Sequence, residues 1–404
     1  MRKKPLWLLT GIVVIGTLTG AVCPDQKVSP GIEMLMNNKR LLTNKRIGLI
    51  TNPTGVDSHL TSSIDLLHQD PHIKLAALFG PEHGVRGDTQ AGDQVDSYID
   101  EKTGLPVYSL YGKTKKPTGE MLQHIDVLLF DIQDVGTRFY TYIYTMAYAM
   151  EAAKENNIPF VVLDRPNPQS GKKVEGPVLD PDYSSFVGRY PIPLVHGMTT
   201  GELAKLFNRE FKIGADLTVI KMKGWKRQMF FEDTELPFVL PSPNMPTPDT
   251  SIVYPGTGLL EGTNISEGRG TTKPFELIGA PYINSTDLAE KLNSLKRPGV
   301  RFRAASFTPT FSKYHHQLCH GVELYVTDRF TFQPVKTGIT IIKTIHDLYP
   351  DHFKFLSSGS FNRLVGNSWM KAMIEKGTAT NEMFKIMDAE KNQFMKVRKK
   401  YLLY

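Results

Sequence analysis

Residues 260–270, which read LEGTNISEGRG, combine three glycines with four side chains that can hold a polar ligand. Ordering a glycine costs conformational entropy, so a folded protein needs a reason to keep such a segment. Carboxylates and amides bind hydroxyl groups, and a pair of carboxyl groups can cleave an acetal. The segment therefore predicts part of a carbohydrate site. Its candidate residues are Glu261, Asn264, Glu267 and Arg269.

A second polar segment, GPEHGVRG at residues 80–87, follows an apolar run. It offers Glu82, His83 and Arg86. A carboxyl group that acts as a general acid must keep its proton near neutral pH, which requires partial removal from water. Glu82, between a proline and a histidine at a strand end, meets that requirement. The second carboxyl group of the pair is left open among Glu175, Glu261 and Glu267.

The elements that must position these residues are short apolar runs that alternate with helical patterns. The runs are rich in Val, Ile, Leu and Phe throughout, as expected for strands buried on both faces. This alternation predicts right-handed crossovers and a mostly parallel, doubly wound α/β sheet. The runs are residues 46–52, 74–80, 126–133 and 159–166, and two of the helical patterns are residues 62–69 and 141–157.

Each of the four predicted strands ends in a polar turn marked by glycine or proline. In open α/β sheets the ligand lies in the crevice outside the carboxyl ends of the strands. We therefore expect four loops to deliver polar groups to one opening. These groups are Glu82, His83, Arg86, Asp131, Asp134, Arg138, Asp164, Arg165 and Asn167.

Later segments are expected to add walls to the same cleft. Glu175 follows a polar turn, and Asn244 lies in the proline-rich stretch PSPNMP, which is too stiff for regular structure. Thr199 and Glu202 have the spacing of a capping box, so a structural role is expected for Glu202.

The chain is predicted to fold as two domains after its N-terminal segment. We expect a catalytic domain over residues 30–283 and a smaller auxiliary domain over residues 284–404 that closes one side of the cleft. In the second domain the patterns indicate a helix at 286–292, strands at 300–310 and 321–328, and helices at 340–350 and 382–404.

Several function classes are disfavoured. Gly256, Gly258 and Gly262 do not have the G-x-G-x-x-G spacing of a dinucleotide site, and phosphate-loop, serine-elbow and H-E-x-x-H motifs do not occur. We therefore expect no cofactor and no metal ion. Basic residues are scattered and not interleaved with aromatics, so nucleic acid is not an expected partner.

The N-terminus predicts export. Three basic residues, at positions 2–4, precede an apolar run that ends in small residues, which is typical of a secretory signal peptide over residues 1–22. The alternative is an uncleaved membrane anchor, because the run approaches the length that spans a bilayer. The three basic residues carry part of the net charge of +7, and the remaining +4 suits an anionic cell wall. A secreted, cell-wall-associated protein is therefore expected.

A set of motifs extends this interpretation over nearly the whole chain, from about residue 31 to residue 404. Together they resemble the exo-β-N-acetylmuramidases of the NamZ type, a family long known only as a domain of unknown function. The motifs are GPEHGVRG, DIQDVGTRFYTY, DRPNP, VEGPVLD, RYPIPLVHGMTTGELA, PSPNMPTPDT, YPGTGLLEGTNISEGRGTTKPFELIGAP and YLLY.

The resemblance implies a Rossmann-like domain and a smaller C-terminal domain with the active site between them. It implies release of N-acetylmuramic acid (MurNAc) from the non-reducing end of peptidoglycan fragments with β-1,4-linked MurNAc-GlcNAc. The partners would be peptidoglycan-derived disaccharides and muropeptides. Glu82 would be the general acid, and the glycines of residues 260–270 would let the backbone approach the sugar.

MurNAc also carries a lactyl carboxylate, and a bidentate arginine is its natural partner. Arg138, Arg165 and Arg269 are the candidates, and the sequence does not choose among them. Two other interpretations remain open: a non-catalytic wall protein that binds sugar in the same cleft, and an amidase or esterase that acts on wall peptides.

Overall fold

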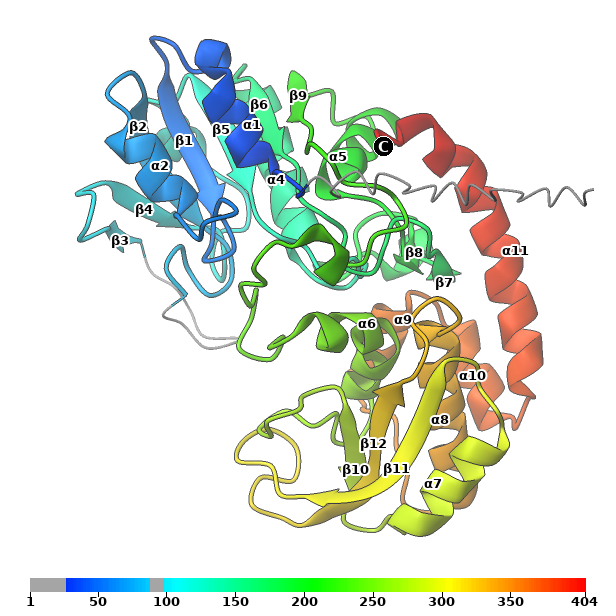
Figure 1. The fold of residues 1–404 in the computed structure, drawn as a ribbon. Coiled ribbons are helices and arrows are strands. Elements are labelled where there is room, and N and C mark those ends of the chain that lie inside the picture. Colours follow the sequence, from blue (N-terminus) through cyan, green and yellow to red (C-terminus); the bar gives the residue numbers. More distant parts are fainter. Residues whose placement is uncertain (1–26, 88–96) are drawn as a thin grey trace, which may run out of the picture.

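The computed structural model describes residues 27–87 and 97–404, which form two domains (Figure 1). The predicted signal peptide, residues 1–22, lies outside the described residues. Within the described residues, no helix combines the length and the apolar character that crossing a membrane requires.

The N-terminal domain is built on a seven-stranded sheet with the order β3-β4-β2-β1-β5-β6-β9. All neighbours pair in parallel except β3 and β4, which are antiparallel. This confirms the predicted α/β fold with a mostly parallel sheet. The strands are β1 Arg46–Thr51, β2 Lys74–Gly80, β3 Tyr98–Ile99, β4 Pro106–Ser109, β5 Val127–Asp131, β6 Phe160–Leu163 and β9 Leu217–Ile220.

Helices cover both faces of this sheet because each strand sends alternate side chains to opposite sides. Ile47 and Leu49 of β1 pack with α1 (Gly31–Asn37) and α2 (Ser63–Gln69) on one face. Ile50 packs with α4 (Tyr142–Glu155) and α5 (Thr200–Glu210) on the other face. The short helix α3 (Gly119–Leu122) adds Leu122 to this second layer. The sheet is therefore doubly wound, as predicted.

The C-terminal domain is built on an antiparallel three-stranded sheet with the order β10-β12-β11. Its strands are β10 Leu277–Ala280, β11 Val300–Phe307 and β12 Cys319–Val326. Because β10 pairs with β12, this sheet begins ahead of the boundary expected at residue 284. The helices of this domain are α6 Pro248–Thr257, α7 Ser285–Ser294, α8 Pro334–Leu348, α9 Ser360–Val365, α10 Trp369–Glu375 and α11 Thr380–Arg398.

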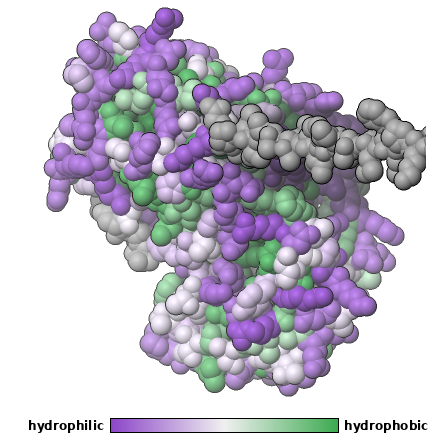
Figure 2. Space-filling model, in the orientation of Figure 1, coloured by the Kyte–Doolittle hydropathy of each residue, from purple (hydrophilic) through white to green (hydrophobic). Residues whose placement is uncertain are grey.

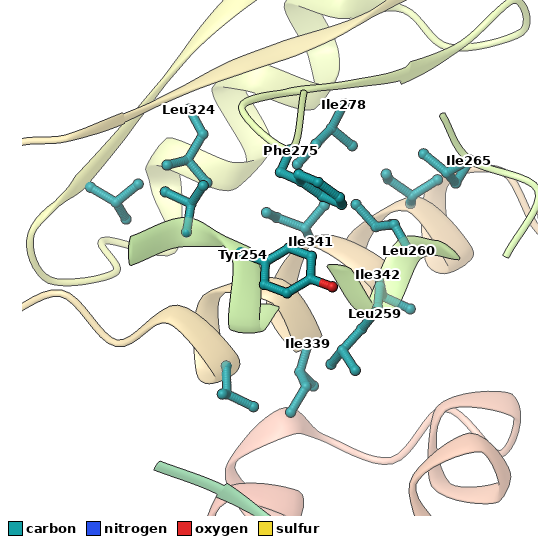
Figure 3. Close-up of a cluster of buried hydrophobic side chains, with 14 of the residues drawn as sticks. Tyr254, Leu259, Leu260, Ile265, Phe275, Ile278, Leu324, Ile339, Ile341 and Ile342 are labelled. Atoms are coloured by element: carbon teal, nitrogen blue, oxygen red, sulfur yellow. The ribbon is translucent and has the colours of Figure 1, made fainter. Parts of the chain in front are cut away.

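The core of the C-terminal domain gathers around α6 and α8. Figure 3 shows Tyr254 of α6 against Phe275, among aliphatic side chains from α8 and from the turn that follows α6. The two helices cross at Gly256 and Gly338, where a Cβ on either glycine would overlap the backbone of the other helix. Gly256 is therefore explained by helix packing, whereas a Cβ on Gly258 would meet the Phe139 ring at 2.9 Å.

Two features join the domains. The antiparallel pair β7 (Glu175–Val178) and β8 (Pro193–Val195) packs against α11, which runs along one side of the molecule toward α5 (Figure 1). The chain beyond α11 then reaches the N-terminal domain, where Tyr404 Oη donates to Asp164 Oδ2 at 2.7 Å. Hydrophilic residues cover most of the face seen in Figure 2, over both domains, with small hydrophobic patches between them.

Candidate active site

Glu82 lies in the turn that follows β2, at the carboxyl edge of the large sheet. Its side chain is partly exposed, whereas the neighbouring His83 is buried. His83 has a φ of 75°, a left-handed conformation that is rare for a residue with a side chain. Such strain persists only where surrounding contacts enforce it, and it is concentrated at functional sites.

Arg86, at the end of this turn, is paired with Asp100. Its Nε and Nη2 donate to the two carboxylate oxygens of Asp100, each at 3.0 Å. The hydrogen bond to Arg86 contributes most to holding the pKa of Asp100 at about 2. Arg86 was predicted to bind substrate, but the structure commits its guanidinium to a carboxylate of the protein itself.

Tyr111 and Tyr142 lie near Glu82. Burial, the charge of Glu82 and a hydrogen bond to it together raise the pKa of Tyr111 to about 12. Burial and the charge of Glu82 also raise the pKa of Tyr142, and Asn52 lies beside the Tyr142 hydroxyl. Tyr142 Oη donates to the carbonyl of Pro241 at 2.6 Å, which ties the proline-rich loop to this cluster.

A chain of aromatic rings links this cluster to the C-terminal domain. The ring centroids are 5.0 Å apart for Tyr142 and Tyr140, 5.9 Å for Tyr140 and Tyr254, and 4.7 Å for Tyr254 and Phe275. The guanidinium of Arg269 lies 5.1 Å from the Phe275 ring centroid. Burial is the largest cause that raises the pKa of Tyr254. The charge of Glu261, from the C-terminal domain, and the weaker effect of Glu82, from the N-terminal domain, raise it further.

The glycine-rich segment forms an ion-pair cluster on the C-terminal side. Glu261 lies in the 3₁₀ helix Gly258–Gly262, and its Oε1 accepts from Arg269 Nη2 at 3.1 Å. Arg269 Nε is 3.3 Å from Glu267 Oε1, and Lys313 Nζ donates to Glu267 Oε2 at 2.9 Å. The Glu261 side chain is 30% exposed and that of Glu267 only 2%. Burial is the largest cause that raises the pKa of Glu261.

The glycines of this segment serve protein packing. Gly268 and Gly270 both have a φ of 80°, and a Cβ at either position would overlap the backbone of Leu277 or of Phe311. These two glycines therefore allow a close approach of neighbouring protein segments, and the approach of this backbone to a sugar stays a prediction. Asn264 has a similar role, since its amide donates to the His352 carbonyl and accepts from Lys354 N.

Asp134 also lies among the tyrosines. Its Oδ2 accepts from Gly136 N at 2.7 Å and is 3.9 Å from His196 Nε2. Its Oδ1 has no hydrogen-bond partner among the described residues. Burial raises the pKa of Asp134 to about 7, and its charge contributes to the raised pKa of Tyr254. The structure thus brings Asp134 to the cluster, but as a buried group.

Other strand-end residues hold the framework together. Arg165 donates to both oxygens of Asp131, from Nε at 2.6 Å and from Nη2 at 2.9 Å, and the pair is buried. Asp164 accepts from Gly201 N and Thr199 Oγ1 at the start of α5, each at 2.7 Å.

Two further predicted residues are also buried and contact the protein itself. Asn167 donates to the Met198 carbonyl at 2.9 Å, and Asn244 is buried in the loop that Tyr142 anchors.

Two predicted residues are bound to other parts of the protein. The buried guanidinium of Arg138 donates to the carbonyls of Pro177, Ile192 and Leu364. Glu175 Oε1 accepts from Lys336 N, at the start of α8, at 2.8 Å. Glu175 lines a cavity of about 550 Å³ together with lysines that include Lys173 and Lys336, and Glu82 does not line it.

The structure therefore brings together Glu82, Asp134, Glu261, Glu267 and Arg269 from the predicted set. Sequence reasoning missed the tyrosines that connect them, Tyr111, Tyr140, Tyr142 and Tyr254. The signal for two of them was present in RFYTY, directly after the polar turn of β5. The catalytic and binding roles of all these residues remain predictions.

Comparisons with known proteins match this architecture. The model of the N-terminal domain of exo-β-N-acetylmuramidase NamZ matches residues 47–249, and the model of its C-terminal domain matches residues 252–404. The chain is 67% identical over 414 aligned positions to the peptidoglycan β-N-acetylmuramidase NamZ of Bacillus subtilis strain 168, with 100% of both chains covered.

Two crystal structures of DUF1343 family proteins from Bacteroides fragilis share the fold. One is 42% identical with a TM-score of 0.88, and the other is 35% identical with a TM-score of 0.77. Each match covers 94% of this chain and 99% of the other. With both domain models matched in order and a full-length relative at this identity, the chain belongs to the exo-β-N-acetylmuramidase NamZ family.

Proposed function

We propose that this protein is a glycoside hydrolase that releases terminal MurNAc from the non-reducing end of peptidoglycan fragments. Membership of the NamZ family and the relationship to the B. subtilis β-N-acetylmuramidase support this activity. The substrates would be β-1,4-linked MurNAc-GlcNAc disaccharides and muropeptides. The observation that carries the proposal is the position of Glu82, which is partly exposed at the carboxyl edge of the sheet and faces tyrosines shared with Glu261.

Glu82 is proposed as the general acid. Its partial exposure lets it reach a glycosidic oxygen, and the hydrogen bond with Tyr111 holds its side chain in position. Tyr111 and Tyr140, which are partly exposed, offer ring surface that suits the apolar face of a sugar.

Arg269 is proposed as the residue that binds the lactyl carboxylate. Arg138 is fully buried against carbonyl groups, and Arg165 is held by Asp131 with a side chain 5% exposed. The Arg269 side chain is 22% exposed and lies beside Glu261. Of the three arginines considered, its side chain is therefore the most accessible to a ligand.

We further propose that the protein acts outside the cell. The basic residues at positions 2–4 and the apolar run that follows support export. Mass spectrometry of the protein recovered from the culture medium would show a chain that begins near residue 22, and recovery from the cytoplasm with residues 1–22 intact would contradict export.

The proposed activity is tested with MurNAc-GlcNAc and the Glu82→Gln variant. The wild type should release MurNAc, and the variant should lose about 10²- to 10⁴-fold in kcat, which is the usual contribution of general acid catalysis. A matched control is Glu155→Gln, which alters an exposed carboxylate paired with Lys116 and should keep the wild-type rate.

Three results would contradict this account. A near-normal rate in Glu82→Gln would exclude Glu82 as the acid. Chromatography that detects released peptide and no sugar would indicate an amidase or esterase. Binding of the disaccharide without any product from the wild type would indicate a non-catalytic sugar-binding protein.

A further inference from the structure

The cavity of about 550 Å³ that Glu175 lines has no part in the proposed muramidase function. The N-terminal domain contributes residues 172–175 to its lining, and the C-terminal domain contributes residues 330–333 and side chains of α8 and α11. Glu82 and Arg269 do not line it. Sites for small molecules typically have volumes of about 300–1,000 Å³, so the cavity is large enough to be one.

The cavity is cationic. Four lysines and two carboxyl groups line it, so positive charge is in excess whether or not Glu175 is ionised. Lys336 Nζ and Lys391 Nζ both donate to Asp388, at 2.8 Å and 3.0 Å, and one carboxylate cannot neutralise two ammonium groups. Lys172 is exposed and has no ion-pair partner among the described residues. The cavity therefore favours a ligand that carries an anionic group.

The fourth lysine, Lys173, holds the cavity wall in place. Its Nζ donates to the carbonyl of Arg329 at 2.8 Å and to that of Phe332, so it ties the N-terminal domain to this loop of the C-terminal domain. Asp328 Oδ1 accepts from Phe330 N at 2.9 Å in the same loop. The wall is therefore formed by contacts within the protein, as is usual for small-molecule sites.

Phenylalanine side chains give the lining an apolar part. Phe230 and Phe332 are buried, whereas Phe330 is 75% exposed. The Phe330 ring meets the Phe230 ring edge to face, with centroids 5.4 Å apart. An apolar side chain of a ligand would cover the exposed ring and remove it from water. A small inorganic anion would leave it exposed.

Glu175 adds a buried polar atom to the lining. The residue is only 6% exposed, and its Oε1 accepts from Lys336 N at 2.8 Å. Its Oε2 is buried and has no hydrogen-bond partner among the described residues. Buried polar atoms in folded proteins are nearly always hydrogen-bonded. An N–H group of a ligand in the cavity would provide this hydrogen bond.

We propose that the cavity binds a short peptide with a free carboxylate and an apolar side chain, at a site separate from the muramidase site. The peptide carboxylate pairs with Lys172 and with the two lysines that share Asp388. A peptide N–H donates to Glu175 Oε2, and the apolar side chain covers Phe330. Phosphate lacks the N–H and the apolar group, and MurNAc, which has a carboxylate and an amide, lacks the large apolar side chain.

Calorimetric titration of the whole protein with the peptide acetyl-Leu-Glu tests this site. The titration is made at pH 8, because burial raises the pKa of Glu175 to about 7 and its oxygen must be free to accept. Acetyl-Leu-Gln amide, which has no carboxylate, should bind about 10- to 100-fold more weakly. Acetyl-Gly-Glu, which has no apolar side chain, should also bind more weakly. Equal binding of the three peptides, or no binding of acetyl-Leu-Glu, would overturn the proposal.

Glu175→Gln tests the hydrogen bond to Oε2. The glutamine carbonyl would stay on Lys336 N, so its amide group, which only donates, would replace an oxygen that accepts. The affinity for acetyl-Leu-Glu should fall about 10- to 100-fold. An unchanged affinity would overturn the proposed binding mode.

Lys336→Gln tests the charge and should weaken binding of acetyl-Leu-Glu by about 10-fold. Lys343→Gln is the matched control, since Lys343 lies on the same helix, also pairs with an aspartate and is similarly shielded, with 11% of its side chain exposed against 13% for Lys336. Lys343 does not line the cavity, so this variant should bind as the wild type does. Equal affinities for the two lysine variants would overturn the proposal.

Kinetics distinguish this site from the muramidase site. Saturating acetyl-Leu-Glu should not raise the KM for MurNAc-GlcNAc, because Glu82 and Arg269 do not line the cavity. Competitive inhibition by the peptide, or displacement of the peptide by free MurNAc, would overturn a separate site. A wild type that binds the peptide but is inactive on MurNAc-GlcNAc would overturn the proposed function and support the peptide site.

Discussion

Tyr254 shows how a single side chain can report on the organisation of the site. Its ring packs at 4.7 Å from Phe275 within the C-terminal core and at 5.9 Å from Tyr140 of the N-terminal domain. Glu261 and Glu82 both raise the pKa of its phenol, in addition to burial. A sugar placed beside this hydroxyl would therefore contact both domains.

Arg269 gives the first prediction at the residue scale. Replacing it with Gln should weaken competitive inhibition by free MurNAc by about 10- to 100-fold, the usual effect of losing a hydrogen-bonded charge. Inhibition by free GlcNAc, which has no lactyl group, should change much less. Arg269→Lys should fall between, because lysine keeps the charge but not the fork geometry. Equal losses for both sugars would mean that Arg269 does not bind the lactyl carboxylate.

Residue type alone could not separate site residues from framework residues. Arg138, Asp164, Asn167 and Asn264 are polar groups in the right loops, yet each binds backbone groups of its own protein. A buried backbone carbonyl or amide needs a partner as strongly as a ligand does. Whether a side chain turns to the cleft or to the backbone depends on contacts that are distant in the sequence.

At the scale of elements, the sheet was predictable because its four central strands carry strong local patterns. β1, β2, β5 and β6 match the apolar runs, and their ends do place Glu82 and Asp134 at one edge. The assignment of β10 was not predictable in the same way. Its four residues join the second sheet through pairing with β12, which is a contact and not a local pattern.

Glu175, which accepts a hydrogen bond from Lys336 N at the start of α8, gives a prediction at this scale. Burial raises the pKa of Glu175 to about 7, so the native protein keeps this proton at pH values where the unfolded chain releases it. Stability from this group is present at low pH and is lost as the pH rises from about 5 to about 8. Glutamine cannot ionise, so the Glu175→Gln variant should not lose this stability. Between pH 5 and pH 8 the free energy of unfolding of the wild type should therefore fall by up to about 3 kcal/mol relative to that of the variant.

Urea unfolding at pH 5 and pH 8 measures this difference. Glu155→Gln, which alters a largely exposed side chain, is the control and should show the same offset from wild type at both pH values. If Glu175→Gln also kept a constant offset, Glu175 would not be a buried acid in the native protein. The groups that face it, Lys173, Lys336 and Arg297, would then keep it ionised.

At the scale of the whole molecule, the chain fixes the two domains against each other from several directions. α11 packs on β7, and the residues after it return to the N-terminal domain, where Leu403 N donates to Glu202 Oε1 at 2.8 Å and Tyr404 donates to Asp164. Glu202 also forms the capping box with Thr199 that the sequence predicts. A fixed domain arrangement is what a site with Glu82 from one domain and Arg269 from the other requires.

The most direct measurement is a crystal structure of Glu82→Gln in complex with MurNAc-GlcNAc. The MurNAc ring should lie beside residue 82, with its lactyl carboxylate toward Arg269. A disaccharide bound in the cavity of Glu175 and Lys336, or anywhere that leaves Arg269 without a sugar contact, would contradict an active site shared by the two domains.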